Sequence, residues 1–179
     1  MVWLSVALMS CGGGGSDTTA SDSTVLQTPP PTSAGGGTSI QPAALAGMRL
    51  VWNDEFEAPG LPDASKWVHD TSRNRDGWYN NELQYYADRR LENARVENGR
   101  LLITARRERL SSAPDFGGQN YTSARLITRG LASWTYGHFE VRARLPCGLG
   151  TWPAIWMLPE DDRYGSWAAS GETLRWPPR

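Results

Sequence analysis

Residues 148–172 read GLGTWPAIWMLPEDDRYGSWAASGE and combine a glycine turn, a run with two tryptophans, an acidic turn and a glutamate preceded by Ser-Gly. Alternate residues of a β-strand project from the same face of its sheet. We therefore expect Trp152 and Trp156 to share one face. Two indoles on one face can belong to the core, or they can form a platform for the apolar face of a sugar ring. The pattern leaves both alternatives open.

The composition of the chain excludes several classes of partner. The 179 residues carry 18 basic and 19 acidic side chains, a net charge of −1, which gives no field that would attract nucleic acid or an anionic membrane surface. The two cysteines are too few for a disulfide scaffold, and the two histidines do not form a zinc-binding spacing. The length suits one domain, with room for a tail.

The N-terminal residues 1–11, MVWLSVALMSC, are a short apolar run that ends in a cysteine and precedes four glycines. They resemble a bacterial lipoprotein signal, in which the cysteine is lipidated and becomes the new N-terminus. The run is too short to span a bilayer. We predict lipidation at Cys11 and an exported protein, either a cell-envelope lipoprotein or secreted, that meets a membrane only through this anchor. The alternative is an apolar start created by a misplaced start codon. If Cys11 is lipidated, Cys147 is an unpaired thiol, which we expect to be a small buried residue.

The next residues, 12–47, are rich in Gly, Ser, Thr and Pro and show no apolar period, which predicts a disordered linker. The folded part is expected to begin near Met48. From there, short apolar runs are separated by turn signals about every 8–12 residues, as in a β-sandwich or barrel. Strands are expected at 50–56, 67–69, 94–96, 101–105, 122–128, 136–145 and 152–158.

Two of these strand predictions have particularly clear signals. Asn98-Gly99 between two apolar runs is a strong hairpin signal. Residues 136–145 show the clearest alternation in the chain, with apolar side chains and Gly137 on one face and charged or polar ones on the other. No amphipathic helical period of useful length occurs, so the sequence predicts an all-β protein.

The segment 77–86, GWYNNELQYY, is dense in aromatic rings and amides. Amides donate and accept hydrogen bonds, which suits a hydroxyl-rich ligand. The alternative is a loop in which Asn and Gln satisfy local backbone groups.

Six motifs occur in an order that resembles glycoside hydrolase family 16, and most closely its bacterial laminarinase-like endo-β-1,3-glucanases. They are WNDEF (52–56), NNELQYY (80–86), ENGRL (97–101), YTSARLIT (121–128), YGHFEVRARLP (136–146) and GTWPAIWMLP (150–159). The resemblance covers residues 48–172. It implies a concanavalin A-like β-jelly-roll sandwich with a substrate cleft on the concave sheet, and retaining hydrolysis of a β-glucan of the laminarin type.

The catalytic motif of this family is Glu-x-Asp-x-x-Glu, or a form one residue shorter, which supplies two carboxyl groups for double displacement. By resemblance, Glu172 matches the nucleophile. Leu174 then occupies the place of the Asp, and Trp176 or Pro177 that of the acid/base Glu. We therefore interpret residues 173–179 as an aberrant tail after an incomplete jelly roll. We predict that the chain as written is inactive and poorly folded.

The resemblance also assigns binding residues. Asn80, Asn81 and Arg125 match positions that hydrogen-bond sugar hydroxyls, although Arg125 could instead serve a salt bridge within the sheet. Trp152 and Trp156 match tryptophans of the family, and we expect Trp156 to line the cleft. No cofactor is required. A structural calcium ion with Glu55 and the Gly99 carbonyl as ligands is implied, although calcium takes six to eight oxygens.

Two functions from different classes remain open for the chain. The first is a surface-anchored, monomeric β-1,3-glucanase that acts on β-glucan. The second is a non-catalytic surface protein that kept the cleft and binds β-glucan without hydrolysing it.

Overall fold

The computed structural model describes residues 2–10, 47–167, 169–171 and 173–175, and in this part the chain is all-β apart from one turn of 3₁₀ helix. The elements are β1 (Val2–Ser10), β2 (Val68–His69), η1 (Tyr79–Asn81), β3 (Gln84–Tyr86), β4 (Ala94–Val96), β5 (Leu101–Ile103), β6 (Tyr121–Ser123), β7 (Arg125–Ile127), β8 (Thr151–Pro159) and β9 (Thr173–Arg175). No helix of the described residues is long and apolar enough to cross a membrane.

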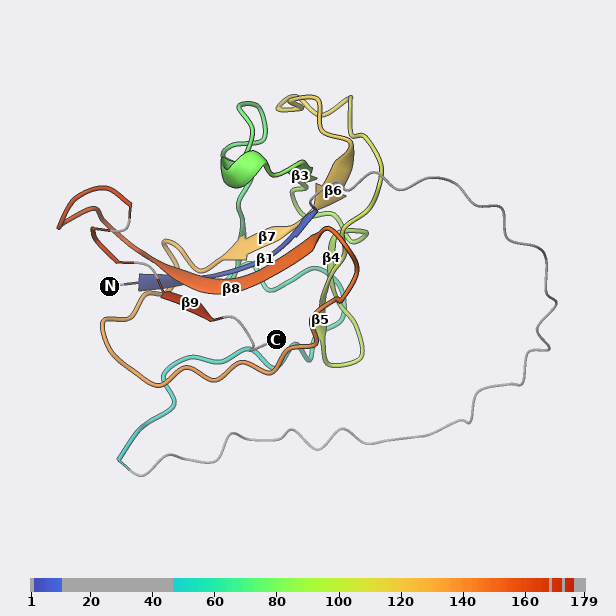
Figure 1. Ribbon diagram of the computed structural model, residues 1–179. Coiled ribbons are helices and arrows are strands. Elements are labelled where there is room, and N and C mark those ends of the chain that lie inside the picture. Colours follow the sequence, from blue (N-terminus) through green and yellow to red (C-terminus); the bar gives the residue numbers. More distant parts are fainter. Residues whose placement is uncertain (1, 11–46, 168, 172, 176–179) are drawn as a thin grey trace, which may run out of the picture.

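The largest sheet has five strands in the order β2-β7-β1-β8-β9, and each neighbouring pair is antiparallel (Figure 1). Its longest ladder joins β1 and β8 over nine residue pairs, from Val2↔Pro159 to Ser10↔Thr151. Because β1 runs antiparallel to both β7 and β8, those two strands run parallel to each other with β1 between them. The N-terminal strand therefore connects the two halves of this sheet.

Two small sheets complete the fold. β3 and β6 pair in parallel, and β4 and β5 form the hairpin that Asn98-Gly99 predicts. Asn98 and Gly99 have φ of 53° and 68°, the left-handed conformation that a tight hairpin turn of this kind requires. The hairpin prediction is confirmed.

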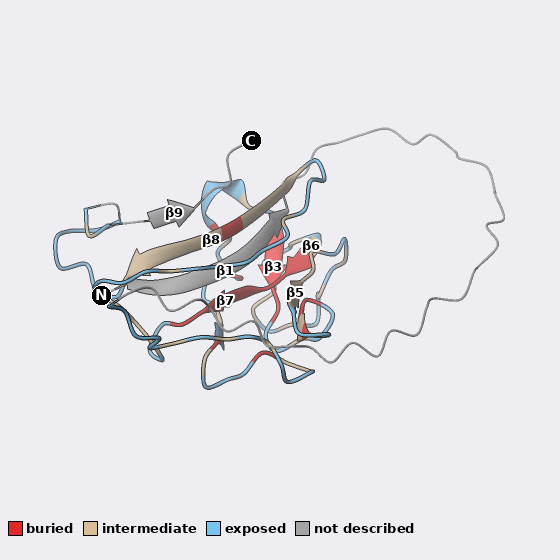
Figure 2. Ribbon diagram, turned by 90° about the horizontal axis from the view of Figure 1, so that it is seen from below, coloured by how far each residue is buried: buried red, intermediate tan, exposed pale blue. Residues whose placement is uncertain are grey.

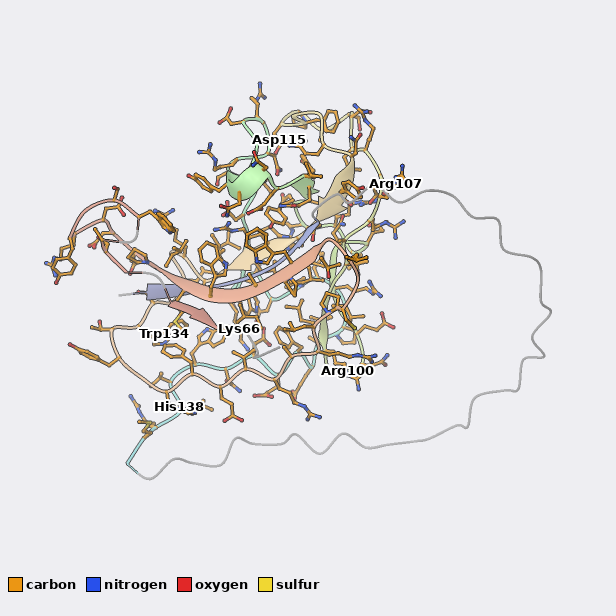
Figure 3. All side chains as sticks on the ribbon, in the orientation of Figure 1. Lys66, Arg100, Arg107, Asp115, Trp134 and His138 are labelled. Carbon is orange, nitrogen blue, oxygen red and sulfur yellow. The ribbon has the colours of Figure 1, made fainter. Side chains whose placement is uncertain are left out.

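Side chains pack on both faces of the five-stranded sheet. On one face Trp152, Ala154 and Trp156 of β8 meet Trp78 and Tyr86. The opposite face packs around two buried residues, Trp67 and Leu126, together with Trp52, Phe56, Leu101, Ile103, Trp134, Ile155 and Met157. Figure 3 shows Asp115 on the side of the first group and Lys66 and Trp134 on the side of the second. The alternation predicted for 152–158 is confirmed.

The most deeply buried elements lie around the small parallel sheet (Figure 2). Asn74, which is fully buried, connects its surroundings through four hydrogen bonds. Its amide nitrogen donates to the Tyr86 carbonyl and to Asp115 Oδ2, both at 2.9 Å. Its oxygen accepts from Trp78 Nε1 at 3.1 Å and from the Tyr86 amide at 3.0 Å. Asn74 thus holds Trp78 and β3 in fixed positions beside the sheet.

Two strand predictions are wrong in the described structure. Residues 50–56 alternate in exposure but pair with no strand. The chain turns at Phe56, where φ is 55° and the amide donates to Asp54 Oδ1 at 3.0 Å. Residues 136–145 are also irregular. Both edges of the nearest long strand, β8, are already paired with β1 and β9, so this segment has no ladder to join.

The strand predicted at 122–128 is in the right place, but the chain forms two short strands there instead of one. The chain forms β6 up to Ser123 and β7 from Arg125, and these strands belong to different sheets. Ala124 is fully buried at the point of change.

Both ends of the chain contribute strands to the five-stranded sheet. Residues 2–10, interpreted as a signal, form β1. Of the seven residues interpreted as an aberrant tail, Thr173–Arg175 form β9 and pair with Met157, Trp156 and Ile155. Cys11 and nearly all of the expected linker lie outside the described residues.

Cys147 is a free thiol, as expected, but the prediction that it is buried is wrong because the residue is exposed. It follows Pro146 in the turn that leads into β8, where Leu149 is also fully exposed.

Candidate functional site

Arg125 lies at the centre of the polar and aromatic groups on the Trp156 face of the sheet. Asp70 follows β2 directly, and its amide donates to the Arg125 carbonyl at 2.9 Å, so the neighbouring strands bring the two side chains together. Arg125 Nε lies 3.1 Å from Asp70 Oδ2, within ion-pair distance but without the angle of a hydrogen bond. Arg125 is only 6% exposed, so the charge is largely shielded from water.

Two indole rings flank the same guanidinium. Its carbon lies 5.1 Å from the ring centroid of Trp78 and 5.0 Å from that of Trp156, both within cation–π range. Trp156 is half-buried, and its Nε1 has no hydrogen-bond partner among the described residues. We call Arg125, Asp70, Trp78 and Trp156 the Arg125 cluster. It combines a fixed positive charge and aromatic faces with a buried indole N–H that has no hydrogen-bond partner among the described residues.

A carboxyl group lies beside this cluster. Glu82 Oε2 accepts a hydrogen bond from Gln84 Nε2 at 2.7 Å and from the Tyr86 hydroxyl at 3.4 Å. Burial raises the pKa of Glu82 above its ordinary value, and the bond from Gln84, the charge of Arg125 and the bond from Tyr86 oppose this rise. Burial likewise raises the pKa of Tyr86 well above its ordinary value. The site therefore pairs one cation with a carboxyl that protonates more easily than usual.

The structure brings together only some of the residues predicted to bind sugar. Arg125, Trp152 and Trp156 lie on one face of the sheet. Asn80 and Asn81 are exposed in η1, both with positive φ, directly before Glu82. Sequence reasoning missed Asp70, Trp78 and Glu82. Alternate residues of a strand share a face, and this alternation in Gln84–Tyr86 extends back to Glu82. It is the signal that could have placed Glu82 beside Gln84 and Tyr86.

No protein-family model matches the sequence. The β-glucanase of Rhodothermus marinus is 58% identical over 125 residues, which are 69% of this chain and 41% of that protein. The crystal structure of SCLam, described as a non-specific endo-β-1,3(4)-glucanase from family GH16, is 61% identical with a TM-score of 0.67 over 70% of this chain and 46% of that one. The chain belongs to glycoside hydrolase family 16. A point mutant of SCLam, crystallised with a glucan at its active site, is 60% identical with a TM-score of 0.68 over 70% of this chain and 49% of that one.

These comparisons confirm the predicted family and the all-β jelly-roll class. The chain spans less than half the length of these family 16 relatives. Glu172, matched to the nucleophile of the family by its sequence context, lies outside the described residues. The Arg125 cluster is the part of the candidate site that lies within the described residues.

The implied calcium ion fits the described residues poorly. Glu55 is exposed and accepts a 3.5 Å hydrogen bond from Asn53, and Gly99 lies in the β4–β5 turn. No group of three His, Cys, Asp or Glu among the described residues could hold a metal ion. Two oxygen donors do not fill a calcium shell, which takes six to eight oxygens.

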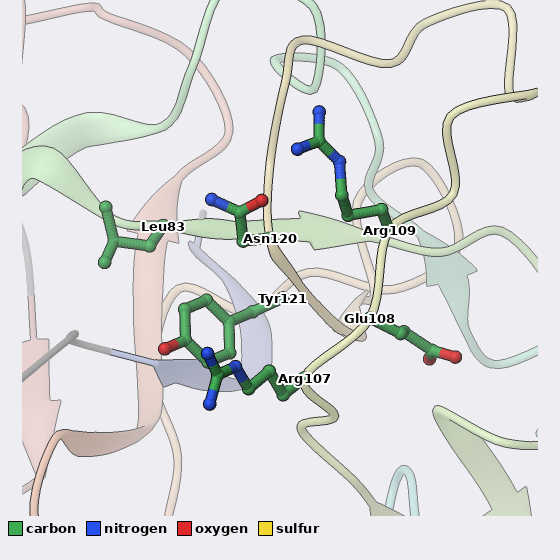
Figure 4. Close-up of a pocket in the computed structure, with 6 residues that line it drawn as sticks. All are labelled: Leu83, Arg107, Glu108, Arg109, Asn120 and Tyr121. Carbon is green, nitrogen blue, oxygen red and sulfur yellow. The ribbon is translucent and has the colours of Figure 1, made fainter. Parts of the chain in front are cut away.

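A shallow pocket of about 590 Å³ lies at the side chain of Leu83 (Figure 4). Its other lining residues are Arg107, Glu108, Arg109, Asn120 and Tyr121. Glu108 accepts hydrogen bonds from Arg90 Nη1 at 2.7 Å and Thr122 Oγ1 at 2.6 Å. These bonds and the nearby arginines lower the pKa of Glu108 to about 2. Glu108 thus fastens the 106–109 segment to β6.

The depressed pKa of Glu108 predicts a pH dependence of stability. A carboxyl whose pKa is lower in the folded state stabilises the fold above its ordinary pKa of 4.5 and loses this effect as the pH falls toward 2. We expect Glu108→Gln to lower the stability at pH 7 and to flatten its decline between pH 4.5 and pH 2. Urea titrations across this range measure both effects. If the stability of Glu108→Gln declined between pH 4.5 and pH 2 as steeply as that of the wild type, Glu108 would contribute no such stabilisation. Glu57→Gln, at an exposed position, is a matched control.

Proposed function

We propose that residues 48–172 are the N-terminal part of a β-glucan hydrolase domain, and that the Arg125 cluster holds a sugar unit of a laminarin-type β-1,3-glucan. The observation that carries this proposal is the buried guanidinium between two indoles on the Trp156 face. Flat aromatic rings contact the apolar faces of sugars, and a guanidinium donates to hydroxyl oxygens in fixed directions. The names of the relatives, a β-glucanase and an endo-β-1,3(4)-glucanase, support a glucan as ligand.

The proposed chemistry of the family domain is retaining double displacement, with Glu172 as the nucleophile. That mechanism needs a second carboxyl group about 5–5.5 Å away to protonate the leaving oxygen. In this sequence residue 174 is Leu, and residues 176 and 177 are Trp and Pro. A positioned general acid contributes about 10²–10⁴-fold in rate. We therefore propose that these 179 residues bind glucan but hydrolyse it very slowly.

The cellular setting is part of the same proposal. Cys11 after an apolar run supports a lipid-anchored or secreted protein, which would reach an extracellular polysaccharide. We propose a monomer that meets a membrane only through this anchor.

Affinity electrophoresis in laminarin-containing gels, paired with a reducing-sugar assay, tests this function. The chain should be retarded by laminarin and release almost no reducing sugar. Trp156→Ala should weaken retardation about tenfold or more, the loss typical of an aromatic contact residue. Tyr136→Ala, which removes an aromatic ring that is 90% exposed, is the matched control and should bind like the wild type. Retardation that is absent, or unaffected by Trp156→Ala, would contradict the proposal.

A further inference from the structure

We propose that Glu82 is a ligand-binding residue of this site, whose carboxylate accepts hydrogen bonds from glucan hydroxyls and makes glucan binding weaken in mild acid. The inference rests on the proposed function, because it names a further residue and a regulation of the same surface. Neither the sequence motifs nor the relatives assign a role to Glu82.

The backbone places Glu82 on the face of the Arg125 cluster. Glu82, Gln84 and Tyr86 are each two residues apart, so in an extended segment their side chains project the same way. The two hydrogen bonds to Glu82 Oε2 confirm that the three side chains meet. Tyr86 also packs against Trp78, with ring centroids 4.7 Å apart, and Trp78 flanks Arg125. Glu82 is thus connected to the cluster through the buried side chains of Tyr86 and Trp78.

The two oxygens of Glu82 have different surroundings. Oε2 is held by Gln84 and Tyr86, whereas no hydrogen bond reaches Oε1 from any residue that the structure describes. The side chain is half-buried, and Oε1 is not among the buried atoms that lack a partner, so it remains within reach of solvent and of a ligand. A carboxylate only accepts hydrogen bonds, and a charge-assisted bond from a hydroxyl is roughly twice as strong as a neutral one. A sugar with neighbouring hydroxyls supplies the donors that Oε1 lacks.

The charged groups around Glu82 set the sign of the pH effect. Gln84 and Tyr86 from β3 donate to the carboxylate, and the charge of Arg125 from β7 favours it; Arg125 is itself paired with Asp70. Burial raises the pKa of Glu82 above its ordinary value, so mild acid protonates it earlier than an exposed glutamate. The protonated carboxyl has lost part of its acceptor capacity, and hydroxyl binding weakens. Affinity for glucan should therefore be full near neutral pH and fall as the pH drops through the raised pKa.

Glu82 could instead be purely structural and hold Gln84 and Tyr86 in place. Glu82→Gln separates the two roles because the amide keeps the shape and an acceptor oxygen for both neighbours. If the role is purely structural, this variant should keep nearly the same melting temperature and the same pH profile of binding. A binding role would change the pH profile.

The test is calorimetric titration of the 179-residue chain with soluble laminarin oligosaccharides at several pH values from 4 to 8. The wild type should bind most tightly near pH 7 and weaken toward pH 4. Glu82→Gln should bind about tenfold more weakly at pH 7, the loss expected for charge-assisted hydrogen bonds, and its affinity should not depend on pH. Glu92→Gln, whose side chain is 53% exposed beside Arg90, should behave like the wild type.

The outcomes separate this inference from the function on which it rests. If the wild type binds no laminarin oligosaccharide at any pH, the proposed function fails and the role of Glu82 falls with it. If the wild type binds, and Glu82→Gln binds equally well with the same pH profile, only the role of Glu82 is overturned. Should Glu82→Gln fail to fold, Glu82→Asp takes its place. It should keep a pH-dependent affinity that is weaker than the wild type, and wild-type affinity in this variant would overturn the inference.

Discussion

A chain that lacks residues 1–10 is expected to lose the cooperative unfolding transition of the full chain, or to melt at least about 10 °C lower. β1 pairs with β8 over nine residues and with β7 over three, and it is the strand between them. Without it the sheet divides into β2-β7 and β8-β9, and two-stranded sheets are marginally stable in water. The unpaired edges of β7 and β8 would also promote aggregation.

Thermal melts by circular dichroism and size-exclusion chromatography of residues 1–179 and 11–179 measure this effect. A gentler version is Val6→Pro, which removes a backbone donor at the position paired with both Leu126 and Ile155. It should lower the midpoint, whereas Val25→Pro in the Gly/Ser/Thr-rich stretch should not. Equal melting of the two chain lengths would contradict the prediction.

This experiment also decides between two interpretations of the N-terminus. Processing at Cys11 would remove the residues that form β1, so a processed lipoprotein needs another strand between β7 and β8. Residues 136–145 lie between those strands in the sequence, alternate like a half-buried strand, and form no ladder in the described structure. Sequential strands usually lie side by side in a sheet. Stable folding of the 11–179 chain would therefore point to this segment as the replacement.

The sequence predicted the features of the fold that depend on local pattern. The alternation of β8 placed Trp152 and Trp156 on one face, and Asn98-Gly99 fixed the β4–β5 turn. The failures at 50–56 and 136–145 concern pairing. An alternating segment becomes a strand only where a neighbour offers a free edge, and distant parts of the chain decide which edges are free. The parallel pairing of β3 with β6 is non-local in the same way.

In the candidate site, too, the residues on patterned strands were predictable from the sequence, and those placed by distant contacts were not. Arg125 and Trp156 could be named from motifs because each lies on a strand with a recognisable pattern. Three residues come to the site from other parts of the chain. Asp70 is placed by its backbone hydrogen bond to the neighbouring strand, Trp78 by its hydrogen bond to the buried amide of Asn74, and Glu82 by the 3₁₀ turn that it follows. The alternative that Arg125 serves a salt bridge is compatible with sugar binding. Its ion pair with Asp70 fixes the guanidinium while both rings stay in contact with it.

Arg125→Met is expected to destabilise the fold by about 3–5 kcal/mol, the usual cost of removing one partner of a buried ion pair. The Asp70 side chain is only 12% exposed and would keep its charge with no cation beside it. Trp78 and Trp156 would lose their contact with the guanidinium, and Glu82 would lose a charge that limits the rise of its pKa. Laminarin binding should become undetectable. Urea titration and affinity gels measure these effects.

The double variant Arg125→Met/Asp70→Asn separates stability from binding. Removing the uncompensated carboxylate should recover a large part of the lost stability, because most of the cost comes from leaving Asp70 charged and unpaired. Binding should not recover, since the guanidinium is still absent. Arg95→Met, which breaks the surface pair with Glu97, should cost about 0–1 kcal/mol and leave binding intact. Recovered binding in the double variant would show that Arg125 acts on glucan only by holding the sheet together.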